Sequence, residues 1–172
     1  MLGLMIIDVQ QAMFGGPQPF HGDTVVARIA DLLGRARAAR TPVFFVQHDG
    51  GPGDPFDKNG PGFAFHPALA PQPGEPITVK RRNSGLYETD LDATLKAAGI
   101  DALVICGMQT EYCVDATVRS AFDRFYRVTV VADAHTTFDS ELLPAATIIA
   151  HTQHIWNGRF ARLKTADEIV FG

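Results

Sequence analysis

The sequence predicts a single doubly wound α/β domain with a mainly parallel sheet. Short apolar runs alternate with amphipathic helical stretches, and most runs are apolar on both faces, as in strands that helices cover on either side. The chain has 172 residues, of which 46% are hydrophobic and 20% charged. This length suits one hydrophobic core and is too short for two well-packed ones, so we expect one domain over residues 1–172.

Five runs rich in β-branched and aliphatic residues are the expected strands. They lie at Leu4–Ile7, Val43–Val46, Ile77–Val79, Ala102–Ile105 and Val128–Val131. Each is short, and a helical pattern follows most of them, which is the alternation typical of parallel sheets.

Four helices are expected from apolar residues at helical spacing and from capping residues. Asp23 is the predicted cap of the first helix, and Thr89 that of the second. The third is predicted to begin at about Cys113, and the fourth near Ser140, with Pro144 in its first turn. The apolar stripe of the third helix is expected to comprise Val114, Val118, Ala121, Phe122 and Phe125.

A long segment, 50–76, interrupts this alternation. Its glycines and prolines mark turns, and its three phenylalanines follow neither the helical nor the strand period. A loop of this length inside a compact domain is usually functional. Two interpretations remain open: a surface excursion that its aromatic residues pin to the core, or a substrate lid or subunit contact.

Charge and hydropathy exclude several classes of partner. Fifteen basic against nineteen acidic side chains give a net charge of −4, so the chain offers no cationic surface for nucleic acid. No apolar run approaches the roughly 20 residues of a membrane span, and the start of the chain lacks the features of a signal peptide. We expect a soluble cytoplasmic protein with a small-molecule substrate.

The two cysteines receive different interpretations. They are too few for a disulfide framework, and their spacing is not that of a redox or zinc pair. Cys106 lies within the fourth strand and is expected to fill space. Cys113 follows the turn after that strand, where helix-terminal amides and the helix dipole can lower the pKa of a thiol and make it a nucleophile. A small buried side chain is the alternative.

Two further reactive groups lie at predicted strand ends. In open α/β sheets, ligands bind beyond the carboxyl ends of the strands. Asp8 follows the first strand and Lys80 the third. A carboxylate can take a proton from a thiol, and an ammonium can stabilise the anionic states, so these residues with Cys113 suit acyl transfer. Alternatively, Asp8 only accepts backbone hydrogen bonds, and Lys80 is solvated.

The sequence resembles a known family across nearly its whole length. The matching stretches are MIIDVQ, VKRRNSGLYETDLDATLKAAGIDALVICG, GMQTEYCVDATVRSAF and RVTVVADAHTTF, of which the third is the most specific. They are similar to the isochorismatase-like cysteine hydrolases, which include nicotinamidases and N-carbamoylsarcosine amidohydrolase-type enzymes.

The resemblance implies a six-stranded Rossmann-like sheet with a catalytic triad of Asp8, Lys80 and Cys113. It also implies a cis peptide at Met108–Gln109 and an oxyanion hole formed by the amides of Gln109 and Cys113. The implied reaction is hydrolysis of an amide or ureido carbon–nitrogen bond through a thioester. Family members that act on isochorismate lack the cysteine, which favours C–N cleavage here. Relatives are commonly oligomers, so a homodimer or homotetramer is expected.

Several polar and aromatic residues are expected around the substrate. They are Gln10, Phe14, His48, Tyr87, Tyr112 and His135. Nicotinamidases hold a metal through an Asp-x-His order on the loop after the second strand, and here His48 and Asp49 lack that order. No metal is therefore expected, and nicotinamide is a less favoured substrate. No nucleotide-binding glycine motif occurs, so no organic cofactor is indicated.

Two other function classes stay open. Cys113 could be oxidised in a thiol redox or sensor protein, although no resolving cysteine is evident. The fold could also carry a binding site without catalysis, because fold alone does not establish activity.

Overall fold

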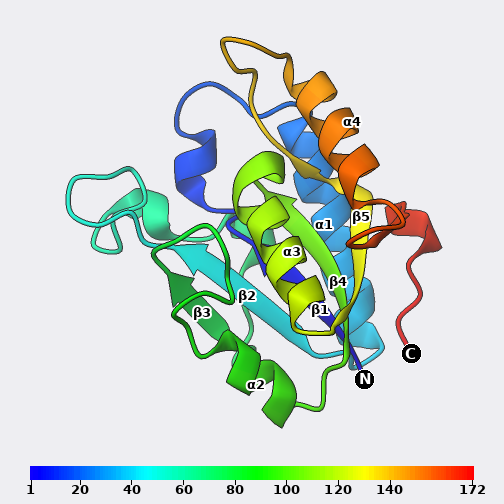
Figure 1. The fold of residues 1–172 in the computed structure, drawn as a ribbon. Coiled ribbons are helices and arrows are strands. Elements are labelled where there is room, and N and C mark those ends of the chain that lie inside the picture. Colours follow the sequence, from blue (N-terminus) through cyan, green and yellow to red (C-terminus); the bar gives the residue numbers. More distant parts are fainter.

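Six parallel strands form the central sheet of the computed structural model, which describes residues 1–172 (Figure 1). The strand order is β3-β2-β1-β4-β5-β6. The doubly wound α/β fold is thereby confirmed, and the sheet is wholly parallel. The strands are β1 (Leu2–Ile7), β2 (Val43–His48), β3 (Ile77–Lys80), β4 (Ala102–Met108), β5 (Arg127–Thr136) and β6 (Arg162–Lys164).

Four α-helices connect or follow the strands. They are α1 (Gly22–Ala38), α2 (Leu91–Ala97), α3 (Asp115–Asp123) and α4 (Ala145–Trp156). None of these helices is both long enough and apolar enough to cross a membrane.

The first two helices begin close to the predicted caps. The N-cap of α1 is His21, so Asp23 lies in the first turn instead, where a carboxylate favours the positive end of the helix. The hydroxyl of Thr89 accepts a hydrogen bond from the backbone N–H of Leu91, although Asp90 occupies the N-cap position of α2.

The last helix begins later than predicted. Pro144 is the N-cap of α4 in an extended conformation, and it precedes the first turn. Ser140 instead stabilises a separate turn, because its hydroxyl accepts the N–H groups of Leu142 and Leu143. The prediction of a helix start near Ser140 is therefore wrong.

Helix α3 departs from the predicted pattern at both ends. A π-helical turn, Thr110–Val114, contains Cys113 and precedes the α-helix. The helix ends at Asp123, so Phe125 lies beyond it and is 94% exposed. Phe122 is 42% exposed and contacts Phe160 edge to face. The predicted apolar stripe was thus too long by these two phenylalanines.

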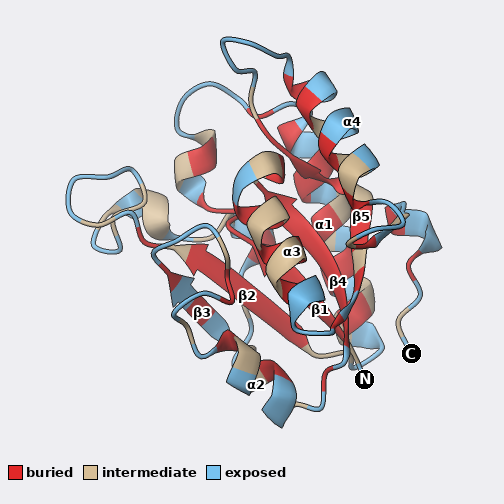
Figure 2. Ribbon diagram, viewed as in Figure 1, coloured by how far each residue is buried: buried red, intermediate tan, exposed pale blue.

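Helices cover both faces of the sheet and create two cores. Alternate residues of β1 serve the two sides: Leu4 and Ile6 pack with α1, whereas Met5 and Ile7 pack with residues of α2, α3 and α4. Figure 2 shows the central strands almost entirely buried, with exposed residues on the outer sides of the helices. This double coverage explains why the strand sequences are apolar on both faces.

The segment 50–76 packs against the domain and is hydrogen-bonded to it. The ring of Phe65 lies edge to face against Phe45 of β2, at 5.2 Å between centroids. The side-chain amides of Gln10 and Gln47 both donate to the carbonyl of Phe63. Aromatic pinning to the core, one of the two interpretations left open, therefore describes this half of the loop.

Candidate active site

The carboxyl edge of the sheet brings three reactive side chains together. Asp8 directly follows β1, Lys80 ends β3, and Cys113 lies in the π-helical turn after β4. The Nζ atom of Lys80 is 2.7 Å from Asp8 Oδ2 and 3.1 Å from Cys113 Sγ. Strand β2 separates β1 from β3, so the long Lys80 side chain bridges a strand separation of about 10 Å.

Asp8 and Lys80 form an ion pair that is closed to solvent. Both side chains have 0% relative exposure. Burial raises the pKa of Asp8 above its ordinary value, and the charge of Lys80 opposes this shift. A buried ion pair is maintained only when each charge has its partner, because either charge alone would be costly in this environment.

The resting form of Cys113 is the protonated thiol. Burial raises the pKa of Cys113 to about 12, and the negative charge of Asp8 adds to the effect, while Lys80 opposes it. The sequence suggested a lowered pKa at a helix terminus, but desolvation and the neighbouring carboxylate outweigh that influence. The thiol therefore needs a base if it is to become a nucleophile.

The backbone before Cys113 follows an unusual path. The Met108–Gln109 peptide bond is cis. The backbone N–H groups of Tyr112 and Val114 both donate to the carbonyl of Gln109. Gly107 has φ = 127°, and a Cβ atom there would lie 2.1 Å from the carbonyl oxygen of Ile7, so glycine is required where β4 passes β1 beside Asp8.

A buried histidine supports this turn from behind. His135 Nδ1 is 2.8 Å from the hydroxyl of Thr110, and His135 Nε2 is 2.9 Å from the side-chain amide of Gln153. Burial lowers the pKa of His135 to about 4, so the ring is neutral. Strand β5 is longer than the predicted run and contains His135, which places the ring beneath the π-helical turn and not at the rim of the crevice.

A cavity of about 310 Å³ opens onto Asp8 and Cys113, and Lys80 contacts both residues from outside its lining. Of the predicted pocket residues, His48 and Tyr112 line it. The remaining wall includes residues that sequence reasoning did not single out, two of them from the segment 50–76. The complete lining is Asp8, Met13, His48, Asp54, Phe56, Asn83, Gln109, Tyr112 and Cys113.

The other predicted pocket residues lie outside this lining. Gln10 is buried and bonds the backbone of His48 through both ends of its amide. Phe14 packs against His66, with ring centroids 4.9 Å apart. Tyr87 is half-exposed and lines a neighbouring surface hollow. Gln10 therefore supports the site from outside the cavity wall.

His48 and Asp49 have separate environments. His48 Nδ1 lies 3.5 Å from Lys80 Nζ, and burial followed by the charge of Lys80 lowers the pKa of His48. Asp49 accepts the N–H groups of Gly51 and Lys58 and pairs with Arg81, so it fixes the loop. No group of three or more His, Cys, Asp or Glu side chains is placed to hold a metal ion.

Comparison with known proteins adds to this geometry. The model of the isochorismatase domain family matches residues 3–157. A streptothricin hydrolase of Streptomyces noursei is 36% identical over 96% of this chain, which spans 60% of that protein's length. A ureidoacrylate amidohydrolase of Methylobacterium radiotolerans is 33% identical over 95% of this chain and 78% of its own.

A solved structure shares the whole architecture. The isochorismatase of Pseudomonas putida KT2440 superposes with a TM-score of 0.93 at 34% identity, covering 98% of this chain and 90% of the other. Fold and site together define a doubly wound α/β protein with a buried aspartate, lysine and cysteine at the carboxyl edge of its sheet. The chain belongs to the isochorismatase family, as its sequence motifs indicated.

Proposed function

We propose that this protein is a cysteine hydrolase that cleaves a carbon–nitrogen bond of a small amide or ureido compound. The observation that carries the proposal is the contact of Lys80 Nζ with both Asp8 and Cys113, which line the same cavity. A nucleophile, a proton acceptor and a cation are the groups that acyl transfer needs.

The first half of the reaction forms a thioester. Asp8 accepts the proton of Cys113, and the sulfur attacks the carbonyl carbon of the substrate. The resulting oxyanion is stabilised by the backbone N–H groups of Gln109 and Cys113, and each such donor typically lowers the barrier by about 2.7–4 kcal/mol. Asp8 then returns its proton to the leaving nitrogen as the C–N bond breaks, which leaves the acyl group on sulfur.

The second half releases the acyl group. Asp8 accepts a proton from a water molecule, whose oxygen attacks the thioester carbonyl. The C–S bond then breaks, the sulfur recovers the proton from Asp8, and a carboxylic or carbamic acid leaves. Lys80 stabilises the negative charge as it moves between Asp8 and Cys113, because its ammonium group contacts both.

The relatives support hydrolysis as the reaction class. Streptothricin hydrolase and ureidoacrylate amidohydrolase are both hydrolases by name. The chain spans less than two thirds of the streptothricin hydrolases that it matches, so the substrate of those proteins does not carry over to it.

The proposal can be tested by trapping the thioester. When the protein is incubated with a panel of small amides and ureido compounds, we expect intact mass spectrometry to detect an acyl adduct that peptide mapping assigns to Cys113. Ammonia or amine should be released in parallel. Peroxide-dependent mass increases without amine release would instead favour a redox function, and reaction with neither reagent would favour a binding protein.

The pH dependence of the reaction should reflect the buried carboxylate. Asp8 acts as a base only when it is ionised, and burial raises its pKa. We therefore expect kcat/KM to fall on the acid side with an apparent pKa above the value of about 4 that is usual for aspartate. A pH–rate profile on an uncharged amide measures this limb. A limb at or below pH 4 would contradict the assignment of Asp8.

A further inference from the structure

We propose that the site is selective for amides that carry a positively charged group, and that Asp54 recognises this group. The inference rests on the function proposed above and specifies its substrate class. It follows from the charges of the cavity wall, from the way in which the Asp54 carboxylate is held, and from the aromatic residues beside it.

The cavity wall carries one uncompensated charge. No lysine or arginine is among its lining residues, and its two acidic residues are Asp8 and Asp54. Asp8 is paired with Lys80, whereas no cationic side chain lies within ion-pair distance of Asp54. Burial and the charge of Lys80 lower the pKa of His48, which also lines the cavity, so they disfavour a positive charge on its ring. The wall therefore presents a net negative charge to a ligand.

The Asp54 carboxylate has a defined orientation. Its Oδ1 atom accepts the backbone N–H of Phe56 at 2.8 Å, and its backbone N–H donates to the carbonyl of Gly51. The side chain lies directly over Gly50, where an added Cβ atom would be 2.2 Å from Asp54 Oδ1. One oxygen is thus used to hold the side chain, and the other is left for a ligand.

The neighbouring residues suit an organic cation. Phe56, Tyr112 and Met13 line the same cavity as Asp54. A carboxylate next to aromatic rings is a favourable environment for an ammonium group, because ring faces attract cations and apolar side chains contact the alkyl stem. The segment 50–76, which supplies Asp54 and Phe56, therefore contributes recognition residues as well as contacts to the core.

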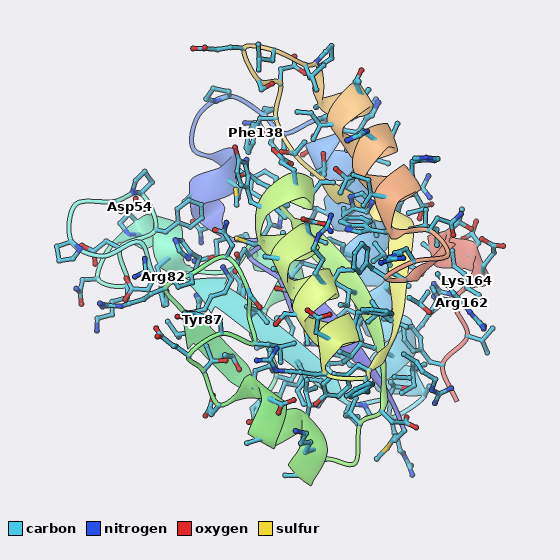
Figure 3. All side chains as sticks on the ribbon, in the orientation of Figure 1. Asp54, Arg82, Tyr87, Phe138, Arg162 and Lys164 are labelled. Atoms are coloured by element: carbon cyan, nitrogen blue, oxygen red, sulfur yellow. The ribbon has the colours of Figure 1, made fainter.

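Arg82, which lies near the cavity, is the residue that would favour an anionic substrate instead. Arg82 lies in a polar hollow of about 350 Å³ that shares His48 with the cavity and also contains Glu88. Figure 3 labels Asp54 on the loop between β2 and β3 and Arg82 on the segment that follows β3. Arg82 is outside the cavity lining, and Arg81, the other arginine of this hollow, is paired with Asp49, so an anionic substrate is the less favoured alternative.

The test compares three amides of matched length. An ω-amino alkanamide, the alkanamide with a methyl group in place of the ammonium, and the ω-carboxy alkanamide are used at chain lengths of three to six carbons. We expect the cationic probe to exceed the neutral one in kcat/KM by about fivefold to tenfold at low salt. This ratio should decrease as salt is added, because Asp54 is exposed to solvent.

Three variants locate the source of this selectivity. Asp54→Asn keeps the acceptor for the Phe56 N–H, and it should reduce the ratio of cationic to neutral probe to about one. Glu88→Gln removes a negative charge from outside the cavity lining, and it should leave the ratio of cationic to neutral probe unchanged. A ratio that Asp54→Asn does not alter would overturn the inference, as would a preference for the carboxylate probe that Arg82→Gln abolishes.

Binding distinguishes this inference from the proposed function. NMR titration of the same probes into the Cys113→Ala variant measures selectivity without turnover, with and without Asp54→Asn. Selective binding that depends on Asp54, in a protein that never forms an acyl adduct, would refute hydrolysis and retain the charge preference. Hydrolysis of neutral and cationic amides at equal rates would refute only the charge preference.

Discussion

Replacement of Cys113 by alanine is expected to lower kcat/KM on any accepted amide by at least about 10⁴-fold, because no other group at the site can form the covalent intermediate. The thiol contacts Lys80 Nζ at 3.1 Å at the base of the cavity. Steady-state kinetics with detection of the released amine measures the loss, and intact mass spectrometry should show that the acyl adduct has disappeared.

The second cysteine provides a matched control. Cys106 is buried in the strand within an apolar core, burial raises its pKa, and its thiol donates to the carbonyl of Met5. Cys106→Ala removes the same atom from the same residue type and should retain most of the activity. Turnover by Cys113→Ala at more than a few per cent of the original rate would exclude covalent catalysis by this residue.

Replacement of Lys80 by methionine is expected to destabilise the fold as well as to abolish activity. The variant keeps an unbranched side chain only one atom shorter but leaves Asp8 without its partner, and removal of one member of a buried pair typically costs about 3–5 kcal/mol. Urea unfolding at neutral pH measures this loss. Turnover should fall in parallel because no cation remains beside the sulfur.

The destabilisation of Lys80→Met should depend on pH in a defined direction. The folded-state pKa of Asp8 is already above its ordinary value and should rise further without Lys80. A raised pKa favours protonation in the folded state, so the contribution of Asp8 to stability is greatest below about pH 4 and is lost as pH rises through the folded-state pKa. The loss should therefore be smaller in acid than at neutral pH.

A double variant tests whether the cost comes from the unpaired charge. Asp8→Asn with Lys80→Met removes both charges and should recover at least half of the unfolding free energy that Lys80→Met alone loses, without recovery of activity. If the double variant is as unstable as Lys80→Met, the destabilisation arises from packing of the Lys80 side chain and not from the ion pair.

The fold was predictable because its signals are local. The runs at Val43–Val46 and Ala102–Ile105 lie within β2 and β4 as observed. Lys80, predicted at the end of the third strand, is the last residue of β3, and its side chain is buried and not solvated. The limits of elements were less predictable, since Phe125 continues the apolar spacing but lies beyond the last turn of α3.

The site was predictable where it depends on strand ends and not where it depends on loops. Asp8, Lys80 and Cys113 each follow or end a strand, and parallel strands bring such positions to one edge. Asp54 and Phe56 reach the cavity through a segment without periodicity, so no pattern marked them. Their location within the long loop 50–76 was the available signal.

Periodicity and motifs are properties of neighbouring residues, so they were enough to predict the succession of the first five strands and the helices along the chain, the family, and the three residues at the sheet edge. Only the packing of distant segments revealed the direction of the Cys113 pKa shift, the place of His135 beneath the π-helical turn, and the charge of the cavity wall. Desolvation and charge pairing depend on which distant segments exclude water from a side chain, and only the packed chain specifies these contacts.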